Sequence, residues 1–86
     1  MRKTIPGAGG CVRVRYGNTG SGAVSILIND ERVDYIDKEA QPYASSQYLR
    51  SDRIVFLPYN QDDIIEIAET SNYAYGGSQA NGVAAV

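Results

Sequence analysis

Carboxylates cluster in two places along this 86-residue chain, where they could bind a metal ion or form the acid–base pair of a glycosidase. Asp62 and Asp63 adjoin in an expected turn, and turn oxygens of this kind are ligands that Ca²⁺ accepts. These two residues are therefore the predicted metal ligands if a structural calcium ion is bound. The alternative is that the acidic residues are solvated or accept hydrogen bonds from turn amides. The two groups are Asp30, Glu31, Asp34 and Asp37, then Asp62, Asp63, Glu66 and Glu69.

Catalysis is not expected from these side chains. The chain contains no histidine, which removes the commonest general base and the commonest zinc ligand. A glycosidase needs two carboxyl groups that face one cleft at a set separation, and a short chain offers little substrate groove. The prediction is a protein that is not an enzyme and needs no cofactor other than a possible Ca²⁺.

Tyrosine supplies nearly all the aromatic surface, with seven tyrosines, one phenylalanine and no tryptophan. Tyr16 and Tyr35 are in phase with apolar positions and are expected at the edge of the core. Five others fall in expected loops, where aromatic side chains either bind ligands or plug the ends of a small sandwich. The predicted ligand-binding residues are these five: Tyr43, Tyr48, Tyr59, Tyr73 and Tyr75.

Three further features have ordinary structural interpretations. Cys11 is the only cysteine and is expected to be a small buried hydrophobic residue, since it begins an apolar alternation. The glycine-rich residues 17–22 are expected to connect two strands, because a phosphate-binding loop would open a helix. Exposed arginines, expected to pair with nearby acids, are Arg13, Arg15, Arg50 and Arg53.

The segments that carry these residues show hydrophobic alternation with a period of two, the pattern of β-strands. Residues 11–16 alternate apolar and arginine side chains, which predicts a half-exposed strand. Residues 23–28 and 32–36 are rich in residues that favour β-strands and are separated by Asn29, Asp30 and Glu31, which predicts a hairpin. Short apolar runs follow at 54–57 and 64–68. The second also fits one helical face, although its three isoleucines favour a strand.

Five to six short strands punctuated by Gly, Pro and Asn predict an all-β fold, a small antiparallel β-sandwich or jelly-roll-like domain. Residues 1–10 are expected to form an N-terminal arm and residues 11–86 a single β-sandwich domain. Within it, residues 72–81 are rich in Gly and Tyr and are expected to form a flexible loop, after which residues 82–86 resume a strand pattern.

Charge and hydropathy limit the partners. The net charge is −2, with signs interspersed, whereas nucleic acids and anionic membranes select a clustered basic face. No apolar stretch approaches the roughly 18 residues of a transmembrane segment. Residues 1–10 have a basic start without the apolar run of a secretory signal, so an extracellular location would require a signal outside this chain.

Residues 11–69 resemble small jelly-roll modules of the carbohydrate-binding-module type. The resemblance rests on an arginine-tyrosine strand followed by Asn, a glycine-rich loop, an Asn-containing hairpin turn and a late strand after an acidic turn. The corresponding residues are 12–18, 24–30 and 62–69. Such modules are commonly larger and carry a binding-face tryptophan, which this chain lacks. The resemblance implies a non-catalytic, lectin-like module and assigns no ligand residue.

Taken together, these observations predict a non-catalytic binding module that recognises a glycan or an extracellular surface through loop tyrosines. The alternative is an accessory structural subunit packed among other protein subunits in a larger assembly. That alternative follows from the modest core that so short a domain can bury.

Overall fold

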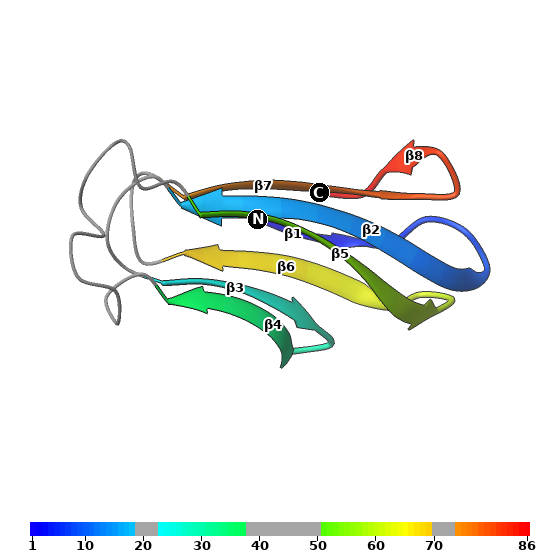
Figure 1. Ribbon diagram of the computed structural model, residues 1–86. Coiled ribbons are helices and arrows are strands. Elements are labelled where there is room, and N and C mark those ends of the chain that lie inside the picture. The colour runs from blue at the N-terminus through cyan, green and yellow to red at the C-terminus, as the bar shows by residue number, and fades with distance from the viewer. Residues whose placement is uncertain (19–22, 38–50, 70–73) are drawn as a thin grey trace.

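The computed structural model describes residues 1–18, 23–37, 51–69 and 74–86, and these residues form two four-stranded antiparallel sheets packed face to face (Figure 1). The first sheet has the order β1-β6-β3-β4 and the second the order β5-β2-β7-β8. The first contains β1 (Arg2–Thr4), β6 (Ile64–Glu69), β3 (Ala23–Ile28) and β4 (Glu31–Asp37). The second contains β5 (Ser51–Asn60), β2 (Gly9–Asn18), β7 (Ala74–Ala80) and β8 (Val83–Ala84). The all-β sandwich prediction is confirmed.

Alternation in the sequence becomes alternation in space along β2. Val12, Val14 and Tyr16 point into the core, while Arg13 and Arg15 point to solvent. Isoleucines from the facing sheet pack against them, because β3 and β6 present the same period of two. The core side chains are Ile5, Val12, Val14, Tyr16, Val24, Ile26, Ile28, Ile36, Tyr59, Ile65, Ile67, Ala80 and Ala85.

The predicted hairpin and the predicted strand at residues 64–68 are both confirmed. Asn29 and Asp30 join β3 to β4 with φ of 52° and 66°, the positive values that a type I′ turn requires. Asn81 and Gly82 join β7 to β8 with φ of 53° and 76°, so a second hairpin uses the same turn chemistry. Residues 64–69 form β6 in the middle of the first sheet.

Two stretches differ from expectation. Residues 2–4 are strand β1 rather than part of an arm, and β2 begins at Gly9. Ile5 is buried and its N–H donates to the carbonyl of Asp63 at 2.8 Å, which anchors the segment. Residues 74–80, expected in a flexible loop, form β7 next to β2. With β1 and β7 added to the expected strands, the described residues contain eight strands rather than five to six.

Two side chains lie on the opposite face from the one expected. Cys11 is exposed, because the inward phase of β2 starts at Val12. Tyr35 is 49% exposed, whereas the neighbouring Ile36 supplies the buried contact of β4. The guanidinium of Arg32 lies 4.4 Å from the centre of the Tyr35 ring, so a cation–π contact holds this tyrosine at the surface.

Candidate functional site

The predicted ligand-binding tyrosines do not form one cluster of loop side chains. Tyr43, Tyr48 and Tyr73 lie outside the described residues. Tyr59 belongs to β5 and Tyr75 to β7, so the expectation that these two lie in loops is wrong. The structure places them in different roles, one inside the sandwich and one on its surface.

Tyr59 is a structural residue at the end of the core. Its side chain is buried, and its hydroxyl donates to the carbonyl of Pro6 at 2.7 Å. The same hydroxyl accepts a hydrogen bond from the Asn81 side-chain amide at 2.9 Å. Tyr59 therefore fastens the segment before β2 and the β7–β8 turn to β5.

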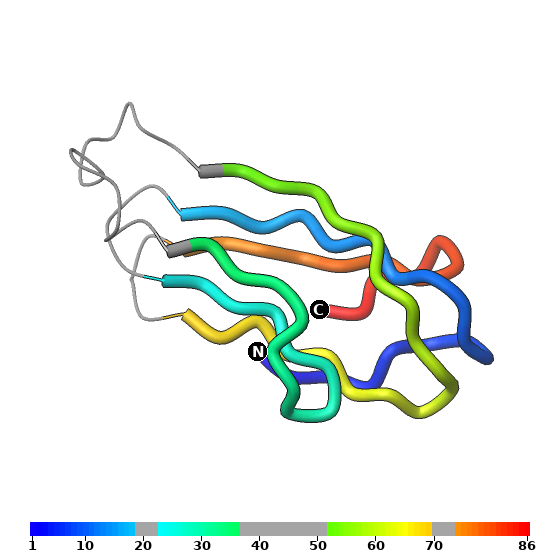
Figure 2. The backbone as a smooth tube through the Cα atoms, turned by 60° about the horizontal axis from the view of Figure 1, so that its bottom comes forward, coloured from blue at the N-terminus to red at the C-terminus, as the bar shows by residue number. Residues whose placement is uncertain are grey.

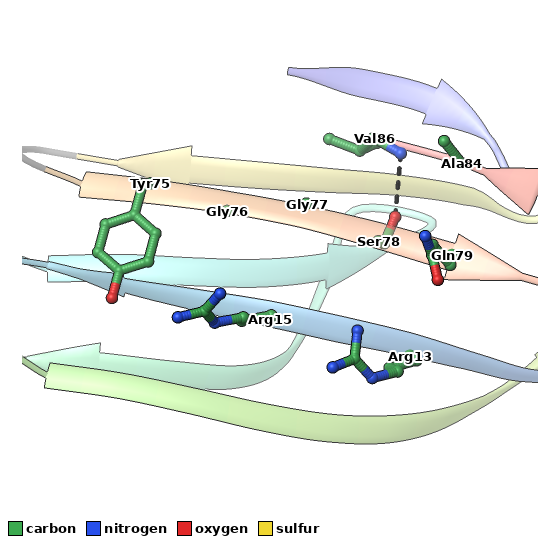
Figure 3. Close-up of a pocket in the computed structure, with 9 residues that line it drawn as sticks. All are labelled: Arg13, Arg15, Tyr75, Gly76, Gly77, Ser78, Gln79, Ala84 and Val86. Carbon is green, nitrogen blue, oxygen red and sulfur yellow. Dashed lines mark hydrogen bonds between the residues drawn. The ribbon is translucent and has the colours of Figure 1, made fainter.

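Tyr75 lies beside a hollow of about 480 Å³ on the outer surface of the second sheet. Figure 3 shows Tyr75 and two arginines of β2, Arg15 and Arg13, in a row along the neighbouring strands. Gln79 of β7 also lines the hollow and lies opposite Arg13 in the strand register. The lining residues are Arg13, Arg15, Tyr75, Gly76, Gly77, Ser78, Gln79, Ala84 and Val86.

Gly77 opens this hollow. It lies opposite Arg15 in the register and between the outward-facing Tyr75 and Gln79, where any other residue would place a side chain. A Cβ at Gly77 would also lie 3.2 Å from the carbonyl oxygen of Val86. Because Gly77 has no side chain, the hollow stays open and residues 85–86 can approach β7 closely.

One carboxylate organises the polar groups beside the hollow. Asp52 of β5 accepts a hydrogen bond from the Tyr75 hydroxyl at 2.9 Å and pairs with the Arg15 guanidinium at 3.1 Å. The hydrogen bond that the Arg15 guanidinium donates to Asp52, together with the negative charge of Asp52, raises the pKa of Arg15. Asp52 thus holds both Arg15 and Tyr75 in fixed orientations, while Arg13 extends from the same outer face of β2 as Arg15.

The predicted metal ligands serve a turn in this structure. Asp63 accepts hydrogen bonds from the backbone N–H of Asn60 at 2.8 Å and from the Asn29 amide at 2.9 Å. These bonds lower the pKa of the Asp63 carboxyl. Asp62 is exposed and has a φ of 71°. Within the described ranges, no three His, Cys, Asp or Glu side chains come together as a metal-binding group.

Gln79, Gly77 and Asp52 are site residues that the sequence prediction missed. Residues 74–80 carry only a faint signal of a strand, because the inward positions Ala74, Gly76, Ser78 and Ala80 are all small. Their glycine and tyrosine content is more typical of a loop, so the pairing with β2 is needed to recognise the strand. Arg13 and Arg15 were correctly predicted to be exposed.

Comparison with protein-family models, with curated proteins and with solved structures gives no match for this chain. In the part of the chain that is described, no helix has the length and apolar character needed to cross a membrane. The function is therefore inferred from the geometry of the hollow and its neighbouring strands.

Proposed function

We propose that the protein is a non-catalytic binding module that recognises a carboxylate-bearing glycan at the hollow between β2 and β7. The observation that carries the proposal is the glycine-floored depression flanked by Arg13, Arg15, Tyr75 and Gln79. It retains the binding module expected from the sequence and moves the ligand from the loops to a sheet surface.

The side chains beside the hollow suit a sugar acid. A guanidinium donates two parallel hydrogen bonds to a carboxylate, and the flat face of an aromatic ring packs against the C–H face of a sugar. Gln79 adds an amide that both donates to and accepts from hydroxyl groups. Because Asp52 already orients Arg15 and Tyr75, little side-chain entropy is lost when a ligand binds.

The same arrangement favours binding over hydrolysis. Glycoside hydrolysis needs two carboxyl groups flanking the sugar, one of them able to donate a proton. Among the described residues, those that line the hollow include no Asp or Glu, and the neighbouring Asp52 already bonds to Arg15 and Tyr75. An acidic glycan held there is expected to be released unchanged.

A glycan array that contains matched neutral and carboxylated sugars tests the proposal, followed by calorimetry on the best ligand. Arg15→Gln and Arg13→Gln are each expected to weaken binding by about tenfold or more, the effect of losing a charge-assisted hydrogen bond. Arg32→Gln is the matched control, since it removes the same charge from an exposed position on β4. Failure of every carboxylated glycan to bind, or equal effects of all three variants, would contradict the proposal.

A structural subunit of a larger assembly is the second candidate function, favoured by two apolar side chains on the surface of β5. Ile54 is 49% exposed and Phe56 is 66% exposed. A subunit of this kind is expected to isolate with a different protein in fixed stoichiometry, which native mass spectrometry measures. Isolation without any other protein would contradict this second function and leave the glycan proposal unaffected.

A further inference from the structure

The four edge strands that the described residues form are unequally protected against pairing with another strand. β1 has three residues and β8 has two, and short edges offer few backbone groups. β4 carries Glu31, Arg32 and Asp34, and its pairing with β3 is interrupted by a register shift. Charged side chains and irregular pairing both discourage addition of a strand.

β5 lacks these protections along its centre. It pairs with β2 over ten residues without interruption, and no other strand of the described ranges pairs with it. Residues 54–57 are Ile, Val, Phe and Leu, a run with high strand propensity and no charge. Figure 2 shows β5 along one margin of the molecule, with β2 beside it.

Backbone direction identifies the groups on the open side of β5. The N–H and C=O of Asn60 bond to Asp63 rather than to β2. Since backbone groups alternate sides along a strand, the N–H and C=O of Ile54 and Phe56 also point away from β2. Pro58 belongs to the same set, which is where a strand tolerates a residue without an N–H.

The neighbouring strands agree with this assignment. Ser78 of β7 exchanges backbone hydrogen bonds with Ala85 and Val86, so its N–H and C=O point away from β2. Alternation across β2 then directs Val14, which lies opposite both Ser78 and Val55, toward β5. Val55 therefore bonds inward to β2, and the residues on either side of it present their backbone groups outward.

We propose that β5 pairs in antiparallel fashion with β5 of a second copy of this chain, about a twofold axis at Val55. In this register Ile54 of one copy lies opposite Phe56 of the other, and each pair exchanges N–H···O bonds through groups that point outward. The two exposed apolar side chains then cover one another on the same face. The second sheets of the two copies join into one continuous sheet.

Charge and proline placement favour a second copy in this register. The charged residues of β5, Asp52 and Arg53, both lie at its beginning. Antiparallel pairing about Val55 keeps the two Asp52–Arg53 ends apart, whereas parallel pairing would bring like charges together. Pro58 falls opposite Asp52 of the other copy, away from the axis, so the central residues keep their donors.

Sedimentation equilibrium over a wide concentration range, with amide hydrogen exchange at the two ends of that range, tests the proposal. The expected result is a reversible dimer in which the amides of Ile54 and Phe56 exchange more slowly at high concentration. Phe56→Lys is expected to raise the dimer dissociation constant by about tenfold or more. Val83→Lys is the matched control, because Val83 is 54% exposed on β8, outside the proposed interface.

Circular dichroism and thermal unfolding establish that each variant is folded before its mass is measured. A protein that is monomeric up to about millimolar concentration would overturn the proposal, a limit that corresponds to about 4 kcal/mol of association free energy. A dimer in which the exchange of the Ile54 and Phe56 amides is independent of concentration would also overturn it. So would a dimer that Phe56→Lys and Val83→Lys weaken equally.

Discussion

The hydroxyl of Tyr16, a fully buried residue of β2, donates a hydrogen bond to the carboxylate of Asp34 on β4 in the facing sheet. Arg53 of β5 pairs with the same carboxylate at 3.1 and 3.2 Å. Burial, followed by the hydrogen bond to Asp34, raises the pKa of Tyr16. This group of three residues joins the two sheets between strands that are distant in sequence.

Tyr16→Phe is expected to lower the free energy of unfolding by about 1.5–3 kcal/mol, the range for a hydrogen bond to a charged group. The ring still fills the core and Arg53 still pairs with Asp34, so the loss reports the hydrogen bond of the Tyr16 hydroxyl. Urea unfolding followed by circular dichroism measures the change. Tyr35→Phe, at an exposed position on β4, is the control and is expected to have little effect. Equal changes for the two variants would contradict this role of Tyr16.

Local patterns were sufficient to predict the strands that bury large side chains on one face. β2, the β3–β4 hairpin and β6 all have branched or aromatic inward positions, and period-two reasoning identified them from the sequence. β7 has small inward positions that pack closely against the facing sheet, so its alternation carries little hydrophobic signal. Only the pairing with β2 shows why residues 74–80 are a strand.

The candidate site depended more on pairing than on composition. The aromatic ring of Tyr75 predicts a ligand-binding residue, but Asp52, which bonds both Tyr75 and Arg15, comes from another strand. Which residues face one another depends on register, and a shift by one residue would move every side chain to the opposite face. Sequence patterns therefore predicted the exposed arginines and missed the hollow that they flank.

Gly7 occupies a position where a side chain is excluded. Its φ is +94°, and an added Cβ would lie 2.1 Å from the Asn81 amide nitrogen and 2.8 Å from the Tyr59 hydroxyl. Gly7→Ala is therefore expected to cost about 1–3 kcal/mol of unfolding free energy through backbone strain and the displaced hydrogen bond. Thermal and urea unfolding provide the measurement.

Gly10→Ala separates the two contributions to the Gly7 effect. Gly10 also has a positive φ, of 128°, but its Cβ would meet nothing within 4 Å. Gly10→Ala is expected to show strain alone and to cost less than Gly7→Ala. An equal or larger loss at Gly10 would show that contacts with Asn81 and Tyr59 are unimportant at Gly7.

Gly76 permits the close approach of the two sheets near Tyr16. A Cβ at Gly76 would lie 2.9 Å from Cδ1 of Ile67 and 3.0 Å from Cβ of Tyr16. Gly76→Ala is expected to lower the free energy of unfolding by about 1–3 kcal/mol, the usual cost of overpacking a core. Chemical denaturation measures it, and Gly76→Ala combined with Ile67→Val is expected to recover part of the loss. No recovery would argue against a steric cause at Ile67.

Asp63 makes part of the stability depend on pH. Its carboxyl has an ordinary pKa of 3.8, which the backbone N–H of Asn60 and then the Asn29 amide lower in the folded protein. A lowered folded pKa stabilises the protein above the unfolded pKa, and that contribution is lost as the pH falls through the folded value. Asp63→Asn is therefore expected to reduce stability at neutral pH and to begin converging with the unsubstituted protein once the pH falls below the ordinary pKa of 3.8.

Unfolding midpoints in urea between pH 7 and pH 2 measure this convergence. Asp30, whose pKa is lowered by its hydrogen bond and charge pairing with Arg2, contributes a loss of the same sign in both proteins and cancels in the difference. Asp62→Asn is the matched control, because it neutralises the adjacent carboxyl of the same turn. A constant gap between Asp63→Asn and the unsubstituted protein at every pH would show that its effect comes from geometry and that ionisation of Asp63 contributes nothing to the stability of the turn.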